Sequence, residues 1–280
     1  MAKINDLNVG CGRKFHPAWT NIDMAASDPA VQAVNLIKGI PFETNRFDLV
    51  YHSQVLEHIP KDKAPAFLAE CMRVLKPGGI LRVVVPDLED LASEYLRLLR
   101  TNLAEPSPES EADYDWIVLE MYDQVVRHHS DGAMAEYLRQ PAIVNEDYVV
   151  GRVGRVARNL IGQSRQPTAA AARSLADRPT GATPAKLGGW LRQHSHRRFG
   201  SEAVRVGSFR LGGKVHLWIY DRFSLSRVLG QAGLVDIRQS NARTSAAPDW
   251  GCYELDVRDG AVPDPASLFM EARKPSGCVG

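Results

Sequence analysis

Two glycines and an aspartate near the N-terminus form the first pattern that could bind a ligand. Gly10 and Gly12 flank Cys11 after the apolar run 7–9, and Asp23 ends a second short apolar run. Glycine has no Cβ, so the chain can turn sharply there and bring its backbone close to a flat ligand. A carboxylate on the neighbouring strand can accept two hydrogen bonds from ribose hydroxyls. The pattern predicts a nucleoside site; the alternative is an ordinary tight turn with a surface aspartate.

The spacing of these residues narrows the class of ligand. Only ten residues separate Gly12 from Asp23, whereas dinucleotide sites place the acid about 20 residues beyond the glycines. Phe15 stands where the third glycine of a dinucleotide fingerprint would be. Both departures disfavour a pyrophosphate at a helix N-terminus. A nucleoside without phosphate is therefore the better fit.

Strand and helix patterns alternate as far as about residue 100. Residues 61–75 carry apolar side chains at helical spacing, Gly78 and Gly79 are placed to end that helix, and Asp87 can cap the next one. Short apolar runs predict strands over residues 4–9, 20–23, 34–36, 48–52 and 80–85. Such alternation predicts a mostly parallel sheet with helices on both faces.

Four motifs in this order resemble the class I S-adenosylmethionine-dependent methyltransferases, in particular their small-molecule and sugar-type branch. The motifs are the glycine turn with Asp23, Leu56-Glu57-His58, Leu75-Lys76-Pro77-Gly78-Gly79 and Pro86-Asp87. Residues 224–232, 234–240 and 267–274 resemble the last helix and the final strand pair of that family. The resemblance implies a Rossmann-like α/β fold, with a mostly parallel sheet, an antiparallel last strand and a largely helical insertion. It also implies S-adenosylmethionine as cofactor.

The resemblance also implies roles for further cofactor-side residues. The backbone at Gly10, Cys11 and Gly12, with Asp23, would hold the amino-acid and ribose parts of the cofactor. Asn35, expected in the third strand, corresponds to the place where relatives keep an acid or amide beside the adenine. Ser53 and Gln54 follow the fourth strand, at the carboxyl edge where ligands bind in open α/β sheets.

Three regions follow from these patterns. Residues 1–100 form the cofactor-binding half, residues 213–280 complete the sheet, and residues 101–212 form a helical, basic insertion that serves as a substrate lid. Within the insertion, residues 116–138 are expected to be helical, and residues 163–189, rich in Ala, Pro, Ser, Thr and Gly, are expected to be a flexible loop.

The insertion is strongly basic. Residues 152–210 hold twelve lysines or arginines against two acidic residues, although the whole chain has a net charge of +1. This excess indicates either a solvated surface or a face that attracts an anionic acceptor. The few aromatic residues there disfavour nucleic acid as the partner.

Candidate acceptor-side residues come from two segments. Residues 214–222 alternate with a period of two, which predicts a strand that projects His216, Trp218 and Tyr220 from one face. Methyl transfer to a hydroxyl benefits from a general base, for which His216 is the first candidate and His58 the second. The remaining candidates are Asp123 as a further catalytic group and, as substrate-binding groups, Gln124, Arg127, Trp218, Tyr220 and Asp221. Of these, Asp123, Gln124 and Arg127 resemble a motif in the substrate lid of some sugar- and natural-product-modifying relatives.

Composition and cysteine usage complete the expectations. The chain has 280 residues, 44% of them hydrophobic, with no apolar run of membrane-spanning length. Its four scattered cysteines indicate free thiols in a reducing cytoplasm, with no metal site. The expected function is O-methylation of a small-molecule or saccharide acceptor. A methyltransferase acting on RNA or protein and a non-catalytic cofactor-binding regulator are the alternatives.

Overall fold

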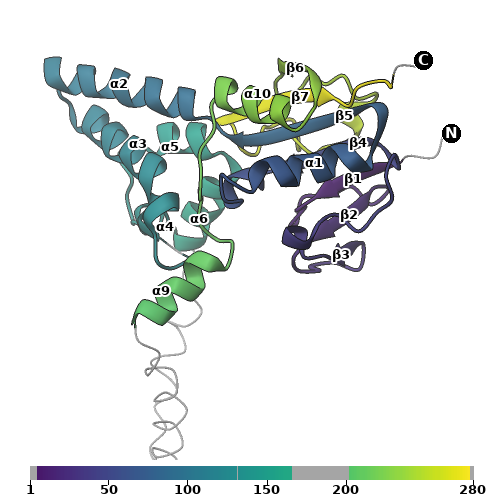
Figure 1. The fold of residues 1–280 in the computed structure, drawn as a ribbon. Helices are drawn as coiled ribbons and strands as arrows, with labels where there is room; N and C mark the ends of the chain where they lie inside the picture. Colours follow the sequence, from purple (N-terminus) through teal and green to yellow (C-terminus); the bar gives the residue numbers. More distant parts are fainter. Residues whose placement is uncertain (1–4, 131, 166–201, 278–280) are drawn as a thin grey trace, which may run out of the picture.

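A seven-stranded sheet organises the chain in the computed structural model, which describes residues 5–130, 132–165 and 202–277 (Figure 1). The strands are β1 (Asp6–Val9), β2 (Thr20–Asp23), β3 (Val31–Ala33), β4 (Phe47–Ser53), β5 (Leu75–Pro86), β6 (Val235–Gln239) and β7 (Ser267–Arg273). Their order across the sheet is β3-β2-β1-β4-β5-β7-β6. The first five are parallel to one another, and β7 pairs antiparallel with both β5 and β6. The predicted fold class is therefore confirmed.

Two boundaries differ from the sequence-based expectation. The third strand, β3, ends at Ala33, so the prediction of a strand over residues 34–36 is wrong, and a 3-10 turn, η1 (Leu36–Lys38), follows instead. The glycines 78 and 79 lie inside β5 rather than in a turn before it. Phe47 pairs with Leu75 but Leu49 pairs with Ile80, so the segment between them bulges out of the strand. Gly78, with φ of 76°, allows that bulge.

One face of the sheet is covered by two helices. The helix α1 (Ala64–Val74) buries Phe67, Leu68 and Cys71, and α10 (Arg222–Gln231) buries Leu225 and Leu229 in the same apolar core. This core lies between the helices and the inward side chains of β1, β4, β5 and β7. The apolar spacing that predicted the first of these helices is confirmed.

The opposite face has no α-helix among the described residues, so the prediction of helices on both faces is wrong there. The segment 241–262, with the 3-10 helix η3 (Trp250–Tyr253), packs over it, and Trp19, Tyr51 and Trp250 form an aromatic cluster. Arg82 is completely buried beneath this segment, and its guanidinium donates to Asp256 and Glu271. The short loop between β1 and β2, as its length predicted, has no room for a helix.

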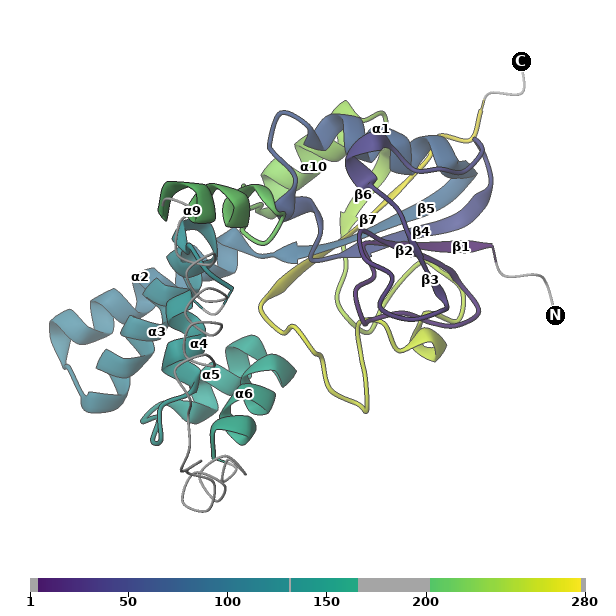
Figure 2. The ribbon, with the colours of Figure 1, turned by 90° about the horizontal axis from the view of Figure 1, so that it is seen from below.

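The helical insertion stands beyond the carboxyl ends of the parallel strands (Figure 2). The helix α2 (Leu88–Ala104) leads into it, and Asp87 caps that helix as predicted by accepting from two backbone N–H groups. The insertion continues with α3 (Pro108–Val126), α4 (Gly132–Leu138), α5 (Glu146–Val153), α6 (Arg155–Arg165) and α9 (Glu202–Leu211). None of the helices in the described ranges is long and apolar enough to cross a membrane.

The expected single helix over residues 116–138 is two helices. The first ends at Val126, where Arg127 turns to an extended ψ of 151°. The side chain of Asp123 then accepts from the backbone N–H of Ala133 and so holds the start of α4. Of the expected flexible loop 163–189, residues 163–165 form the end of α6, and the remainder lies outside the described residues.

Candidate active site

The turn after β1 is fixed by hydrogen bonds to β2. The N–H groups of Gly10 and Cys11 both donate to the carbonyl oxygen of Ile22, at 2.8 and 3.2 Å. Gly10 and Gly12 have φ values of 67° and 54°, in the left-handed region. A Cβ at Gly10 would lie 2.5 Å from a methyl group of Val55, whereas a Cβ at Gly12 would meet nothing within 4 Å. Gly10 is therefore required by packing, and Gly12 faces open space.

The carboxylate of Asp23 lies directly beside this turn. One of its oxygens accepts from the N–H of Gly12 at 2.9 Å, and the other accepts from the N–H of Ala25 at 3.1 Å. Each carboxylate oxygen keeps a further lone pair for a ligand hydroxyl. Burial, followed by the charge of Asp23, raises the pKa of Cys11 to about 11, so that thiol is neutral. The sequence-predicted group of Gly10, Cys11, Gly12 and Asp23 is brought together.

The other predicted cofactor residues, Ser53, Gln54 and Asn35, lie in different surroundings. Ser53 ends β4, and its hydroxyl accepts from the ammonium of Lys14 at 3.4 Å, next to the turn after β1. Gln54 follows with φ of 57°, and its amide donates to the hydroxyl of Ser267 at 3.1 Å. Asn35 is exposed and follows β3, so its predicted place within a strand is wrong.

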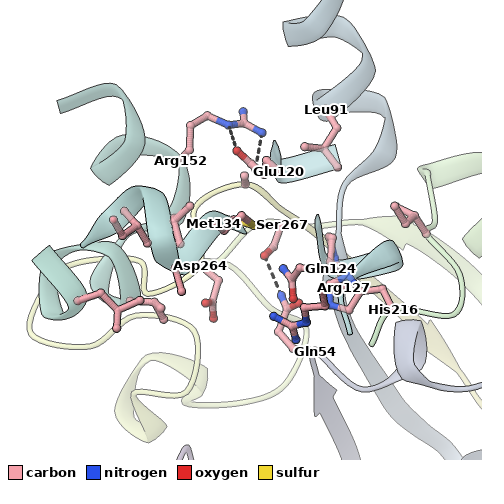
Figure 3. A pocket seen from close by; sticks show the side chains of 18 of the residues that line it. Gln54, Leu91, Glu120, Gln124, Arg127, Met134, Arg152, His216, Asp264 and Ser267 are labelled. Carbon is pink, nitrogen blue, oxygen red and sulfur yellow. Dashed lines mark hydrogen bonds and ion pairs between the residues drawn. The ribbon is translucent and has the colours of Figure 1, made fainter. Parts of the chain in front are cut away.

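A cavity of about 390 Å³ lies between the carboxyl edge of the sheet and the insertion (Figure 3). We call it the edge pocket. Its polar lining on the side of the sheet comes from Gln54, His58, Asp264 and Ser267. On the side of the insertion, and on the segment that returns from it, the polar lining comes from Glu120, Gln124, Arg127, Ser130, Arg152 and His216.

The walls of the edge pocket are held by ion pairs. The guanidinium of Arg152, on α5, donates to both carboxylate oxygens of Glu120 on α3, at 3.0 and 2.8 Å, and also pairs with Asp90 on α2. On the sheet side, the ammonium of Lys14 lies 3.3 Å from a carboxylate oxygen of Asp264. Arg127 differs, because its guanidinium donates to the backbone carbonyl of Lys214 and its Nε is buried without a partner among the described residues.

Several predicted acceptor-side residues line this pocket, and others do not. Gln124, Arg127, His58 and His216 line it. Three of them, Gln124, Arg127 and His216, lie close to Gln54 on one side of the pocket (Figure 3).

Asp123, by contrast, is buried and occupied with the start of α4, so it does not line the pocket. Asp221 is likewise occupied, because its carboxylate accepts from the N–H of Ser224 in the capping box of α10. The predicted roles of these two carboxylates in catalysis and substrate binding are not supported by their positions.

The predicted strand over residues 214–222 is also wrong. The N–H of His216 donates to the carbonyl of Gln124 at 2.9 Å, and the N–H of Leu217 donates to the carbonyl of Glu57 at 2.7 Å. The segment therefore bridges two different elements instead of pairing along one strand. Trp218 is 37% exposed and stacks on the ammonium of Lys61, whereas Tyr220 is buried. The three rings do not share one face, and neither Trp218 nor Tyr220 lines the edge pocket.

The two histidines of the pocket contact each other and lie near the buried Glu57, with one potential ligand atom from each of the three side chains within 4.8 Å of the other two. The rings of His58 and His216 meet edge to face, with centroids 4.9 Å apart. Burial lowers the pKa of His58, and burial together with the charges of His58 and Arg127 lowers the pKa of His216 to about 3. Burial raises the pKa of Glu57 to about 8. All three groups are therefore held in an environment that favours their neutral forms.

Sequence reasoning missed several groups that build this site. Glu57, within the Leu56-Glu57-His58 motif, received no role, although its neighbour His58 did. Asp264 was missed because nothing in a loop sequence indicates that it folds back over the carboxyl edge, and Ser267 was assigned only to the final strand pair. The ion pair between Glu120 and Arg152 could not be predicted either, because the two residues lie on different helices and are distant in sequence.

Comparison with known proteins gives one family match, over the N-terminal part of the chain. Residues 7–83 match the family model of a methyltransferase domain. No curated protein matches the chain. Similar solved structures include the DszA carbon methyltransferase, with 20% identity over 30% of this chain and 29% of that one, and a TM-score of 0.25.

Two further solved structures resemble the chain. A Burkholderia thailandensis 1,6-didemethyltoxoflavin-N1-methyltransferase, bound to 1,6-didemethyltoxoflavin and S-adenosylhomocysteine, is 19% identical over 29% of this chain and 44% of its own, with a TM-score of 0.25. The CurJ carbon methyltransferase is 12% identical over 99% and 50%, with a TM-score of 0.37. The chain thus spans half or less of each of these proteins.

The similarity to these three structures says nothing about the acceptor of this chain, because each of their TM-scores is below 0.5. The family match covers the glycine turn, Asp23 and the Leu56-Glu57-His58 motif. Over residues 7–83, the chain is therefore similar to a methyltransferase domain.

Proposed function

We propose that this chain transfers a methyl group from S-adenosylmethionine to an oxygen atom of a small acceptor held in the edge pocket. The observation that carries this proposal is the position of the pocket. Gln54, which directly follows β4 at the carboxyl edge, lines the pocket together with Gln124 and Arg127 from the insertion. A molecule in the pocket therefore lies between the ligand-binding edge of an α/β sheet and a second wall of polar side chains.

The cofactor side fits a nucleoside that carries no phosphate. Gly12 leaves open space beside the turn, and the two oxygens of Asp23 keep lone pairs for ribose hydroxyls. When bound, S-adenosylmethionine supplies an electrophilic methyl group on a positively charged sulfur. The residues of this chain then have to align the acceptor with that methyl group and exclude water.

The size and polarity of the edge pocket suit a sugar or another small hydroxylated acceptor. Small-molecule pockets in proteins range from about 300 to 1,000 Å³, and this one has about 390 Å³. Arg127 has no acidic partner among the described residues, so its guanidinium is available for an anionic group of the acceptor. Gln124 can bind a hydroxyl beside it as donor or acceptor.

The acceptor hydroxyl must lose a proton as its oxygen forms the new bond to carbon and the carbon–sulfur bond breaks. His216 was predicted to take that proton, and it does line the edge pocket. Burial leaves it a neutral imidazole with a lowered pKa, which makes it a poor base on its own. Its role as a general base stays a prediction.

A screen with methyl-labelled S-adenosylmethionine tests this proposal. The acceptors are nucleotide sugars, free glycans, phenols and bulk RNA, each incubated with wild-type protein and with Arg127→Ala. Label in a small hydroxylated acceptor, reduced in the variant, supports the proposal. Label only in RNA that survives protease would contradict it. Tight cofactor binding without transfer to any acceptor would favour a non-catalytic regulator.

One observation keeps a macromolecular acceptor as a second candidate. A separate cavity between α5, α6 and the loop 258–265 is lined by Arg155, Arg158 and Arg258, with Asp259 as its one acidic lining residue. Such a cluster attracts anionic groups, as RNA phosphates or acidic peptides would supply. A charge reversal such as Arg158→Glu should lower RNA methylation if this candidate is correct, and should leave methylation of a small acceptor unchanged if it is not.

A further inference from the structure

We propose that Glu57, His58 and His216 form a binding site for a zinc-like divalent cation at the floor of the edge pocket. One potential ligand atom from each of the three side chains lies within 4.8 Å of the other two. Two imidazoles and one carboxylate are a common ligand set for catalytic zinc and related divalent metals.

The backbone brings these residues together from two distant parts of the chain. Glu57 and His58 lie in η2 (Leu56–His58), immediately after β4. The segment that returns from the insertion is fastened to them, because the N–H groups of Leu217 and Trp218 donate to the carbonyl of Glu57 at 2.7 and 3.2 Å. The three side chains are therefore held in place by the fold rather than by chance surface proximity.

The carboxylate of Glu57 lacks a partner. The residue is completely buried, and neither of its oxygens has a hydrogen-bond partner among the described residues. An unpaired buried carboxylate is unfavourable, and it is satisfied by a proton or by a cation. Asp264, a second carboxylate, lines the same pocket as His58 and His216. Both features favour a cation at this place.

A backbone hydrogen bond fixes the tautomer of His58. Its Nδ1 lies 2.9 Å from the carbonyl oxygen of Val215, and a carbonyl can only accept, so Nδ1 carries the proton. The lone pair is then on Nε2. A hydrogen bond from the other ring nitrogen to a backbone carbonyl is the arrangement that fixes metal-binding histidines.

Two features set conditions on the site. Ligand atoms about 2.1 Å from a zinc ion stand about 3.4 Å apart, so small side-chain rotations must draw the cluster together on binding. Arg127 lines the same pocket as His58 and His216 and brings a positive charge to it. The ion is therefore held only with the Glu57 carboxylate ionised, and loss of that charge should abolish binding.

A cation at this position would help to deprotonate an acceptor hydroxyl, for which the pocket otherwise has only a poor base. His58 and His216 line the edge pocket, so a coordination position beyond them faces the acceptor. A hydroxyl bound to the cation loses its proton far more readily than a free one. This consequence rests on the proposed function, because it assumes that an oxygen acceptor occupies the pocket.

The test measures metal binding directly, on the full chain. Cys252, an exposed thiol, and Cys278, outside the described residues, are both changed to serine so that thiols do not bind the metal. The protein is treated with EDTA, desalted and titrated with ZnCl2 by calorimetry and with CoCl2 by visible absorption. We expect one ion per chain, with the affinity reduced at least about 100-fold in Glu57→Gln and in His216→Gln.

Controls separate loss of the site from loss of the fold. His128→Gln, at an exposed histidine close in sequence to the insertion side of the pocket, should bind metal as the parent does. Calorimetry with S-adenosylmethionine should show unchanged cofactor affinity in Glu57→Gln if that variant is folded. Absence of stoichiometric Zn²⁺ and Co²⁺ binding by the parent protein would overturn the inference, as would equal binding by folded Glu57→Gln.

Methyl transfer is measured separately on the same samples. Metal binding at this cluster without transfer to any acceptor would support the site while contradicting the proposed function. Transfer that persists unchanged in a parent protein shown to bind no metal would contradict the site while supporting the proposed function.

Discussion

The backbone N–H of Gly12 donates to the carboxylate of Asp23 at 2.9 Å. This bond joins the turn after β1 to the end of β2 and places the carboxylate next to the open space at Gly12. The short connection between the two strands, which left no room for a helix, is therefore sufficient to build the nucleoside side of the site.

Asp23→Ala should weaken binding of S-adenosylmethionine. The substitution removes two charge-assisted hydrogen bonds to the ribose, worth about 1.5–3 kcal/mol each before compensation, so we expect a loss of affinity of at least about 100-fold. Calorimetry measures the change, and Asp62→Asn, at an exposed carboxylate that pairs with Lys63, serves as the control. Unchanged affinity in a folded Asp23→Ala protein would refute this placement of the ribose.

The two glycines of the turn should respond differently to substitution. In Gly10→Val the side chain would collide with Val55, so the folded protein should be destabilised by about 3 kcal/mol or more. In Gly12→Ala the methyl group enters open space, and the left-handed φ alone costs about 1 kcal/mol. Thermal denaturation should show the larger loss for Gly10→Val, and calorimetry should show weakened cofactor binding for Gly12→Ala at temperatures where it is folded. A reversed order of stability would mean that the turn packs differently.

Arg127→Lys and Arg127→Ala should affect the acceptor rather than the cofactor. The guanidinium lines the edge pocket and has no acidic partner in the described structure. With an anionic acceptor we expect KM for the acceptor to rise about 10-fold or more in Arg127→Ala, and partial recovery in Arg127→Lys. Cofactor affinity should stay the same. An equal fall in cofactor affinity would place Arg127 on the cofactor side instead.

Asp6 should make the stability of the protein depend on pH. Burial, followed by the charge of Asp48, raises the pKa of Asp6 to about 6 from a usual 3.8. The folded chain therefore binds the proton more tightly than the unfolded chain, and the stability present below pH 4 is lost as pH rises through 6. The full shift corresponds to about 3 kcal/mol, which solvent screening through the exposed Asp48 and Lys76 should reduce to about 1 kcal/mol.

Asp6→Asn removes this titration. Its melting temperature should exceed that of the wild type at pH 7–8, and the difference should shrink towards pH 4. A difference that is constant across this range would show that Asp6 does not titrate as expected.

The first half of the fold could be predicted because its signals are local. The apolar spacing over residues 61–75, the Asp87 cap and the turn between Gly10 and Asp23 each depend on neighbouring residues. The end of the first helix was misjudged, because the chain is already extended at Leu75, three residues before the first glycine.

The site on the insertion side could be predicted only in part, because its geometry depends on distant contacts. The alternation of residue types around His216 indicated a strand. The backbone N–H of His216 instead donates to the carbonyl of Gln124, ninety-two residues earlier in the chain. Asp123 carried the charge expected of a catalytic group, but that charge is used to begin α4. Glu57 was hidden because a motif gives no indication of whether its acid is exposed or buried.

Methyl transfer from labelled S-adenosylmethionine to a panel of small hydroxylated acceptors tests the central claim most directly. Wild-type protein should label at least one acceptor small enough for a cavity of about 390 Å³. Asp23→Ala should reduce the initial rate when the cofactor is limiting. Arg127→Ala should reduce it when the acceptor is limiting. Label in none of the small acceptors by a protein that binds the cofactor tightly, or labelling unaffected by both substitutions, would contradict it.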